Sequence, residues 1–126
     1  MSAACASTPG FRRIRKISDM TDPPPSKTYV LLDERADGIG NGYFLLLMDG
    51  FPDRPGARSL VDYPSNTHNG AGGLNFADGH LEIHRWLDPR TQPIYQKDVH
   101  LTVWPPRTTP NSADIDWLQE RATGRK

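Results

Sequence analysis

The chain has 126 residues, a length that fits one domain. Its 15 basic and 15 acidic side chains give a formal net charge of zero, which argues against nucleic-acid binding, because proteins that bind phosphate backbones carry a basic excess. Hydrophobic residues make up only 36% of the chain, and its 12 prolines and 11 glycines predict short strands joined by many turns.

The N-terminal stretch shows no periodic apolar pattern. We expect residues 1–10 to form a disordered tail and residues 11–126 to form the domain. The basic cluster at residues 12–16 is predicted to be solvated, and the single cysteine, Cys5, excludes an internal disulfide. No run approaches the roughly 18 apolar residues of a membrane span, and no signal peptide is visible. Taken as it stands, the chain would be cytoplasmic.

The first predicted elements are short. Apolar spacing predicts a helix at residues 14–20, ended by the prolines at 23–25. Residues 29–32 and 43–48 are continuous apolar runs, so both predict strands buried on their two faces. A further strand is predicted at residues 100–104.

The strongest local signal is a β-hairpin. Asp78-Gly79 lies between the β-prone segments 74–77 and 80–86, and Asp-Gly is a preferred hairpin turn because its residues tolerate positive φ. Alternation predicts a half-buried second arm, in which Leu81 and Ile83 share one face and His80, Glu82 and His84 share the other, solvated face.

The chain ends in a predicted helix. Asn111 or Ser112 is expected to cap it, and it should run to about Ala122 with Ile115 and Leu118 in its apolar stripe. Together the elements predict an α+β fold: a small antiparallel β-sheet with hairpins and a C-terminal helix.

One motif stands out near the hairpin. His68 is followed by nine residues and then by Asp78 and Gly79. We interpret the three residues as structural, with the histidine hydrogen-bonded to the turn and fixing the hairpin. Catalysis by His68 and Asp78 is the weaker interpretation, because no serine or cysteine nucleophile with a plausible base accompanies them.

Two groups of residues could bind a metal. His80, Glu82 and His84 alternate along one strand face, a geometry that zinc sites use. The loop after the first apolar strand carries oxygen ligands suited to calcium, although its spacing is not that of an EF-hand; these are Asp33, Glu34 and Asp37. For both groups the simpler interpretation is an ordinary polar surface, with no cofactor.

The segment THNGAGGLNFADGHLEIHRW, with His68, Asp78 and Gly79 at the defining positions, resembles the prepilin-type proteins with an H-X9-DG motif. The order of segments RKISDM, PSKTYVLLDE, GYF and DWLQERA also resembles that family, over residues 11–122. Arg35 is a departure, because a histidine commonly follows the Asp-Glu pair there.

The resemblance implies a pseudopilin-like globular head of the type II secretion or type IV pilus kind. Such heads follow a cleaved leader and a long apolar helix, neither of which this sequence shows, so a sheet face that the helix normally covers would be exposed. The implied function is structural or in assembly and not enzymatic, at the periplasm or cell surface. The implied partners are other pilin-like subunits or further copies of the chain, with membrane contact only through the missing anchor.

Two other functions stay open. A metal- or glycan-binding surface domain would use aromatic side chains to stack on sugars, the candidates being Tyr63, Trp86, Tyr95 and Trp104. A hydrolase would use His68 and Asp78.

Overall fold

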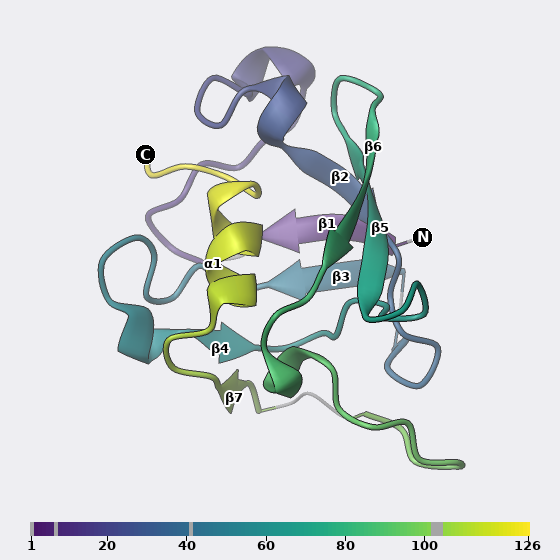
Figure 1. Ribbon diagram of the computed structural model, residues 1–126. Helices are drawn as coiled ribbons and strands as arrows, with labels where there is room; N and C mark the ends of the chain where they lie inside the picture. The colour runs from purple at the N-terminus through teal and green to yellow at the C-terminus, as the bar shows by residue number, and fades with distance from the viewer. Residues whose placement is uncertain (1, 7, 41, 102–104) are drawn as a thin grey trace.

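The computed structural model describes residues 2–6, 8–40, 42–101 and 105–126 (Figure 1). In this part of the chain, a five-stranded sheet has the order β3-β1-β2-β5-β6, and a two-stranded sheet joins β4 and β7. The large sheet comprises β1 (Ser2–Ala6), β2 (Tyr29–Leu32), β3 (Tyr43–Leu46), β5 (Ala71–Phe76) and β6 (Leu81–Arg85). The other elements are β4 (Ser59–Leu60), β7 (Arg107–Thr108), α1 (Ala113–Glu120) and the 3-10 turns Ile17–Asp19, Pro25–Lys27, Pro55–Ala57 and Pro89–Thr91.

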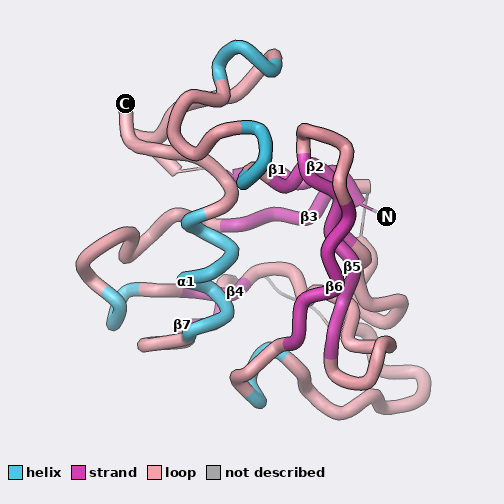
Figure 2. Tube along the Cα trace, turned by 45° about the horizontal axis from the view of Figure 1, so that its top comes forward, coloured by secondary structure: helices cyan, strands magenta, loops and turns pink. Residues whose placement is uncertain are grey.

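The predicted α+β class, with a small sheet and a C-terminal helix, is confirmed. The β1–β2, β2–β5 and β5–β6 pairs are antiparallel, and β1–β3 is parallel. The α1 helix lies across one face of the sheet, in front of β1 and β3 in Figure 1, and the turned view of Figure 2 shows it as a separate layer. The fold is therefore a helix layer on a sheet layer.

The prediction of a disordered tail was wrong for residues 2–6. They form β1, whose backbone pairs Ala3 with Leu31 on one side and Ala4 with Phe44 on the other. A strand's ladder uses backbone groups, which a run of small residues supplies without any apolar periodicity. The sequence pattern therefore carried no signal for this strand.

The two apolar runs are strands, but neither is buried on both faces as predicted. In β3, Phe44 is buried while Tyr43 is exposed. In β2, Tyr29 and Leu32 are buried, and Leu31 is partly exposed. The β2–β5 register shifts between Tyr29 and Leu31, and this irregularity lets residues three apart both face the core.

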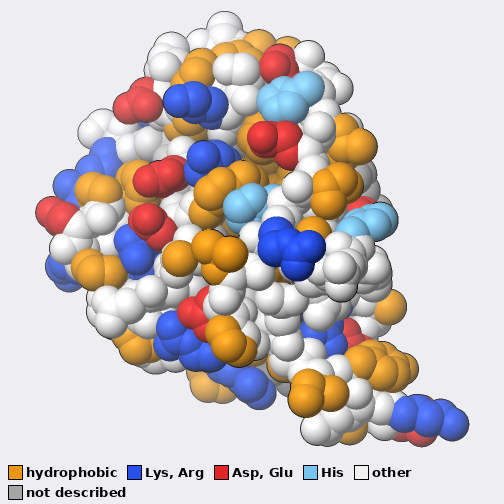
Figure 3. Space-filling model, in the orientation of Figure 1, with side chains coloured by type: hydrophobic (Ala, Val, Ile, Leu, Met, Phe, Trp, Pro, Cys, Tyr) orange, Lys and Arg blue, Asp and Glu red, His pale blue; other side chains and the backbone are white. Residues whose placement is uncertain are grey.

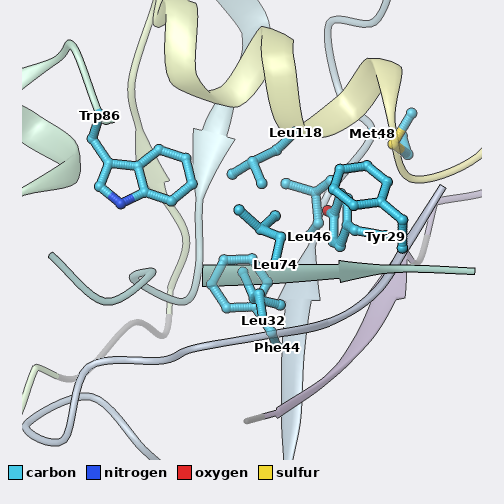
Figure 4. Close-up of a cluster of buried hydrophobic side chains, with 9 residues drawn as sticks. Tyr29, Leu32, Phe44, Leu46, Met48, Leu74, Trp86 and Leu118 are labelled. Carbon is cyan, nitrogen blue, oxygen red and sulfur yellow. The ribbon is translucent and has the colours of Figure 1, made fainter. Parts of the chain in front are cut away.

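The core lies between α1 and the covered face of the sheet. Figure 4 shows Leu118 directed from α1 toward side chains from β2, β3 and β5. Its buried members are Tyr29, Leu32, Phe44, Leu46, Met48, Leu74, Phe76, Trp86 and Leu118.

The helix begins where the sequence predicts. Ser112 is its N-cap, and its Oγ accepts a hydrogen bond from the N–H of Ile115 at 3.2 Å. Of the helix predicted at residues 14–20, only the 3-10 turn Ile17–Asp19 forms. The strand predicted at residues 100–104 falls largely on 102–104, which lie outside the described residues; His100 and Leu101 are not in a strand.

A buried carboxylate holds the helix to the segment after β6. Asp114, in the first turn of α1, is only 1% exposed. It accepts hydrogen bonds at 2.9 Å from the N–H groups of Leu87 and Asp88 and at 2.7 Å from the hydroxyl of Thr91. Three donors on one carboxylate compensate its desolvation and fix the helix start against this segment.

We expect Asp114→Asn to lower the free energy of unfolding by about 1–3 kcal/mol, because its amide group would face buried N–H donors. Chemical denaturation measures the change. Glu120→Gln, on the same helix but with a side chain 54% exposed, is the control and should change stability by less than about 1 kcal/mol. Equal effects of the two substitutions would contradict the anchoring role of Asp114.

Candidate functional site

The motif formed by His68, Asp78 and Gly79 lies on both sides of strand β5. His68 precedes the strand and Asp78-Gly79 follows it, so the nine intervening residues are the end of a loop, the strand and Ala77. At about 3.3 Å per residue, β5 separates its two ends by roughly 17 Å. The hydrogen bond predicted between His68 and the turn is therefore ruled out by the geometry, as is joint catalysis by His68 and Asp78.

At the far end of β5 the motif forms the predicted hairpin turn. The N–H of Gly79 donates to the carbonyl of Phe76, and the N–H of Phe76 donates to the carbonyl of His80, both at 2.9 Å. Gly79 adopts φ +96°, the left-handed conformation that closes a three-residue hairpin loop. The Asp-Gly pair predicted positive φ at both residues, and the turn has it at Gly79 alone.

The carboxylate of Asp78 reinforces the turn. It accepts a hydrogen bond from the backbone N–H of His80 at 3.1 Å and also contacts Nδ1 of that ring. These two contacts lower the pKa of Asp78, and the side-chain contact raises the pKa of His80. Within the described residues, the contacts of the Asp78 carboxylate lie in its own hairpin.

At the near end of β5, His68 meets Asp33. Nε2 of His68 lies 4.0 Å from Oδ2 of Asp33, and the His68 N–H donates to the carbonyl of Ala71 at 3.1 Å. The Asp33 carboxylate lies over Gly73, where an added Cβ would stand 3.0 Å from its oxygen. The loop after β2 and the loop before β5 therefore meet here, through a pair that the spacing of the motif did not predict.

A close backbone approach holds the loop before His68 on β5. The carbonyl of Ser65 would lie 2.4 Å from a Cβ placed on Gly72, so only glycine fits there. The same carbonyl accepts a hydrogen bond from Nε1 of the buried Trp86 at 2.8 Å. Sequence reasoning missed Ser65, because nothing in its neighbourhood along the chain indicates this contact.

The predicted metal ligands do not converge. His80 lies 3.6 Å from Glu82, but His84 is stacked on Trp117, and Asp33 faces His68. The Asp37 carboxylate forms a bidentate ion pair with the buried Arg35, and the backbone of Glu34 forms a bridge with Pro64. Among the described residues, no group of three His, Cys, Asp or Glu side chains could hold a metal ion.

Arg35, which follows the Asp-Glu pair, is buried and holds two segments of the chain together. Besides binding Asp37 at 2.7–2.9 Å, its guanidinium donates to the carbonyl of Pro93. It thereby ties the loop after β2 to a segment far along the chain. The bidentate geometry is specific to arginine.

Of the predicted sugar-stacking aromatics, the three that the structure describes are not gathered on one surface. Trp86 and Tyr63 are buried, Tyr95 is exposed, and Trp104 lies outside the described residues. Trp86 packs edge-on against His84 and Trp117.

His84 is packed between the sheet and the helix. Its ring stacks on Trp117 with centroids 3.7 Å apart, and Arg121 lies over the same indole at 4.3 Å. Burial lowers the pKa of His84, and the nearby Arg121 lowers it further, whereas Asp114 and Glu82 act in the opposite direction. The neutral imidazole is therefore the form that the fold accommodates.

The sheet face away from α1 is open and carries exposed apolar side chains, with Asn75 and the Asp33 carboxylate beside them. The strand register places Tyr43, Leu31 and Leu81 in one row across the sheet, with Ala3 and Asn75 as the intervening partners. Ile83 lies two residues after Leu81 in β6, on the same face. These side chains, which we call the outer face, are exposed: Tyr43 61%, Leu31 38%, Leu81 56% and Ile83 56%. Figure 3, which looks onto the side that carries α1, shows acidic and basic groups mixed with apolar ones.

The orientation predicted for β6 was therefore wrong. Leu81 and Ile83 point to solvent, and the predicted wet face carries His84 into the contact with α1. Alternation separates two faces but does not say which one the helix covers.

Comparisons with family models, with curated proteins and with solved structures gave no match. Among the described residues, no helix is long and apolar enough to cross a membrane.

We expect Gly79→Ala to destabilise the protein by about 1–2 kcal/mol, because an added Cβ meets no atom within 4 Å and the cost is that of a left-handed backbone alone. Thermal or chemical denaturation measures this. Gly56→Ala is the matched control, since that glycine also has open space and no positive φ. Equal stabilities of the two variants would show that the turn does not need glycine.

The protein should lose stability at acidic pH through His84. Its folded-state pKa lies below the ordinary value of about 6.5, so its contribution is present above that pH and is lost as the pH falls through the folded pKa. His84→Phe keeps the stacking on Trp117 and cannot titrate. Between about pH 7 and 5, the free energy of unfolding of the wild type should fall relative to that of the variant. A difference between the two proteins that stays constant with pH would refute the role of His84.

Proposed function

We propose that this chain is a structural or assembly component resembling the extracytoplasmic head of a type II secretion or type IV pilus-like pseudopilin, acting at the periplasm or cell surface and not as an enzyme. The observation that carries the proposal is the open apolar outer face. The resemblance of the segment that contains His68, Asp78 and Gly79 supports the same proposal.

A sheet in a two-layer fold normally buries one apolar face and leaves the other polar. Here the α1 side of the sheet is buried, and the opposite side still presents Tyr43, Leu31, Leu81 and Ile83. Contiguous exposed apolar side chains typically mark an interaction surface. The resemblance implies that an apolar anchor helix covers one face of the sheet, and the outer face is the one that α1 leaves open.

The motif residues support an assembly role through geometry. His68 and Gly79 fix the two ends of β5, and the hairpin then holds β6 at the edge of the sheet with Leu81 and Ile83 outward. Edge strand and apolar side chains together form a surface to which a further subunit can add. The partners proposed are other pilin-like subunits or further copies of this chain.

The test is the concentration dependence of self-association, measured by analytical ultracentrifugation. We expect the wild type to associate and Leu81→Lys/Ile83→Lys to weaken association on the order of a hundredfold, since each side chain contributes about 1.5 kcal/mol or more when buried.

The control is Ile94→Lys/Tyr95→Lys, which removes two exposed apolar side chains outside the sheet, 86% and 64% exposed. It should associate as the wild type does. A monomeric wild type at all concentrations, or equal loss in both variants, would count against assembly through the outer face. Circular dichroism checks that each variant is folded.

A further inference from the structure

A second surface of the molecule is a basic cleft. The segment after β1 runs back along the C-terminal end of the chain, where the N–H of Arg12 donates to the carbonyl of Gly124 at 2.8 Å and the N–H of Lys126 to that of Gly10 at 3.0 Å. Gly124 fits there because a Cβ would lie 2.4 Å from the carbonyl of Asp22. Between this segment, β2 and the C-terminus lies an open cleft of about 910 Å³.

All the charged residues that line the cleft are basic. They are Arg12, Arg13, Arg15, Lys16 and Lys126, although the whole chain has a net charge of zero. Within the described part of the chain, none of these side chains forms an ion pair with a carboxylate; Asp19 accepts hydrogen bonds from the backbone N–H groups of Arg15 and Lys16 instead. Uncompensated cations around a concave surface focus a positive potential on it. The cluster is more than the solvated run that the sequence predicted.

The remaining lining is largely apolar. Phe11, Ile14, Met20, Tyr29 and Val30 all contribute to the cleft. A ligand that used both parts would carry negative charges and apolar groups together. The size of the cleft exceeds what one small anion requires, and its concave shape does not suit a flat lipid surface.

The backbone of the segment also has unused hydrogen-bonding groups. Arg13 and Ile14 engage neither their N–H nor their C=O groups with another described residue. Arg13 and Arg15 are exposed, while Ile14 between them is half-buried, the alternation of an extended chain. An extended peptide can pair with such a segment through its main chain while alternate side chains enter pockets.

We propose that this cleft binds an extended acidic segment of a partner protein, in which carboxylates alternate with apolar side chains. The carboxylates meet the basic residues, the apolar side chains contact Ile14 and Val30, and the backbone pairs with residues 13–14. This surface is distinct from the outer face, and the inference does not depend on the proposed function.

The test is fluorescence anisotropy with a short labelled peptide of alternating Glu and Leu. Arg13→Glu/Arg15→Glu should weaken its binding on the order of tenfold, and added salt should weaken binding to the wild type. The matched control, Lys97→Glu/Arg107→Glu, makes the same change in net charge at exposed positions outside the cleft and should bind within about twofold of the wild type.

Three results would overturn the proposal. Equal loss in the cleft variant and the control would mean that net charge alone attracts the peptide. Binding of a peptide of Glu and Ser as tight as that of Glu and Leu, or displacement by inorganic phosphate, would mean a general anion site. Co-sedimentation with anionic lipid vesicles without peptide binding would identify a membrane surface.

Discussion

The α1 helix packs on one face of a sheet that is wider than the helix is long. Its eight residues span about 12 Å, whereas five strands extend over roughly 19 Å. Its placement therefore depends on polar contacts as well as on Leu118. Asp114 binds the segment after β6, Gln119 donates to the carbonyls of Leu47 and Asp49 at 2.9 and 3.0 Å, and Arg58 pairs with Asp116. These contacts fix the helix on one face and so decide which face stays open.

The motif residues lie at the two ends of the strand that precedes the exposed edge strand β6. The missing side chain at Gly72 in β5 lets the Ser65 backbone pass close to the strand, and the turn at Gly79 returns the chain as an edge strand. Because both ends of β5 are fixed, the hairpin can expose Leu81 and Ile83 without losing its register. A rigid strand with outward apolar side chains suits a protein that acts by packing against other subunits.

The outer face and the basic cleft differ in their chemistry and in the elements that form them. The outer face is presented by β2, β3 and β6, whereas the cleft is formed by the segment that connects β1 with β2 and by the chain's C-terminal end. One surface offers apolar area without selecting for charge, and the other selects for carboxylates. The zero net charge of the chain conceals this separation.

Local signals in the sequence were sufficient for the elements whose geometry depends on near neighbours. The Asp-Gly hairpin, the Ser112 cap and the α+β class follow from turn and capping chemistry within a few residues. Other features needed partners far along the chain. Strand β1 forms through backbone pairing, for which a run of small residues gives no signal. His68 lies beside Asp33 and not beside the turn. Which side of β6 is buried depends on where α1 lies. The sequence by itself determined the alternation of side chains along each strand, and only the tertiary structure decided which alternate set faced the core, because a strand with a period of two has two faces and the helix covers one.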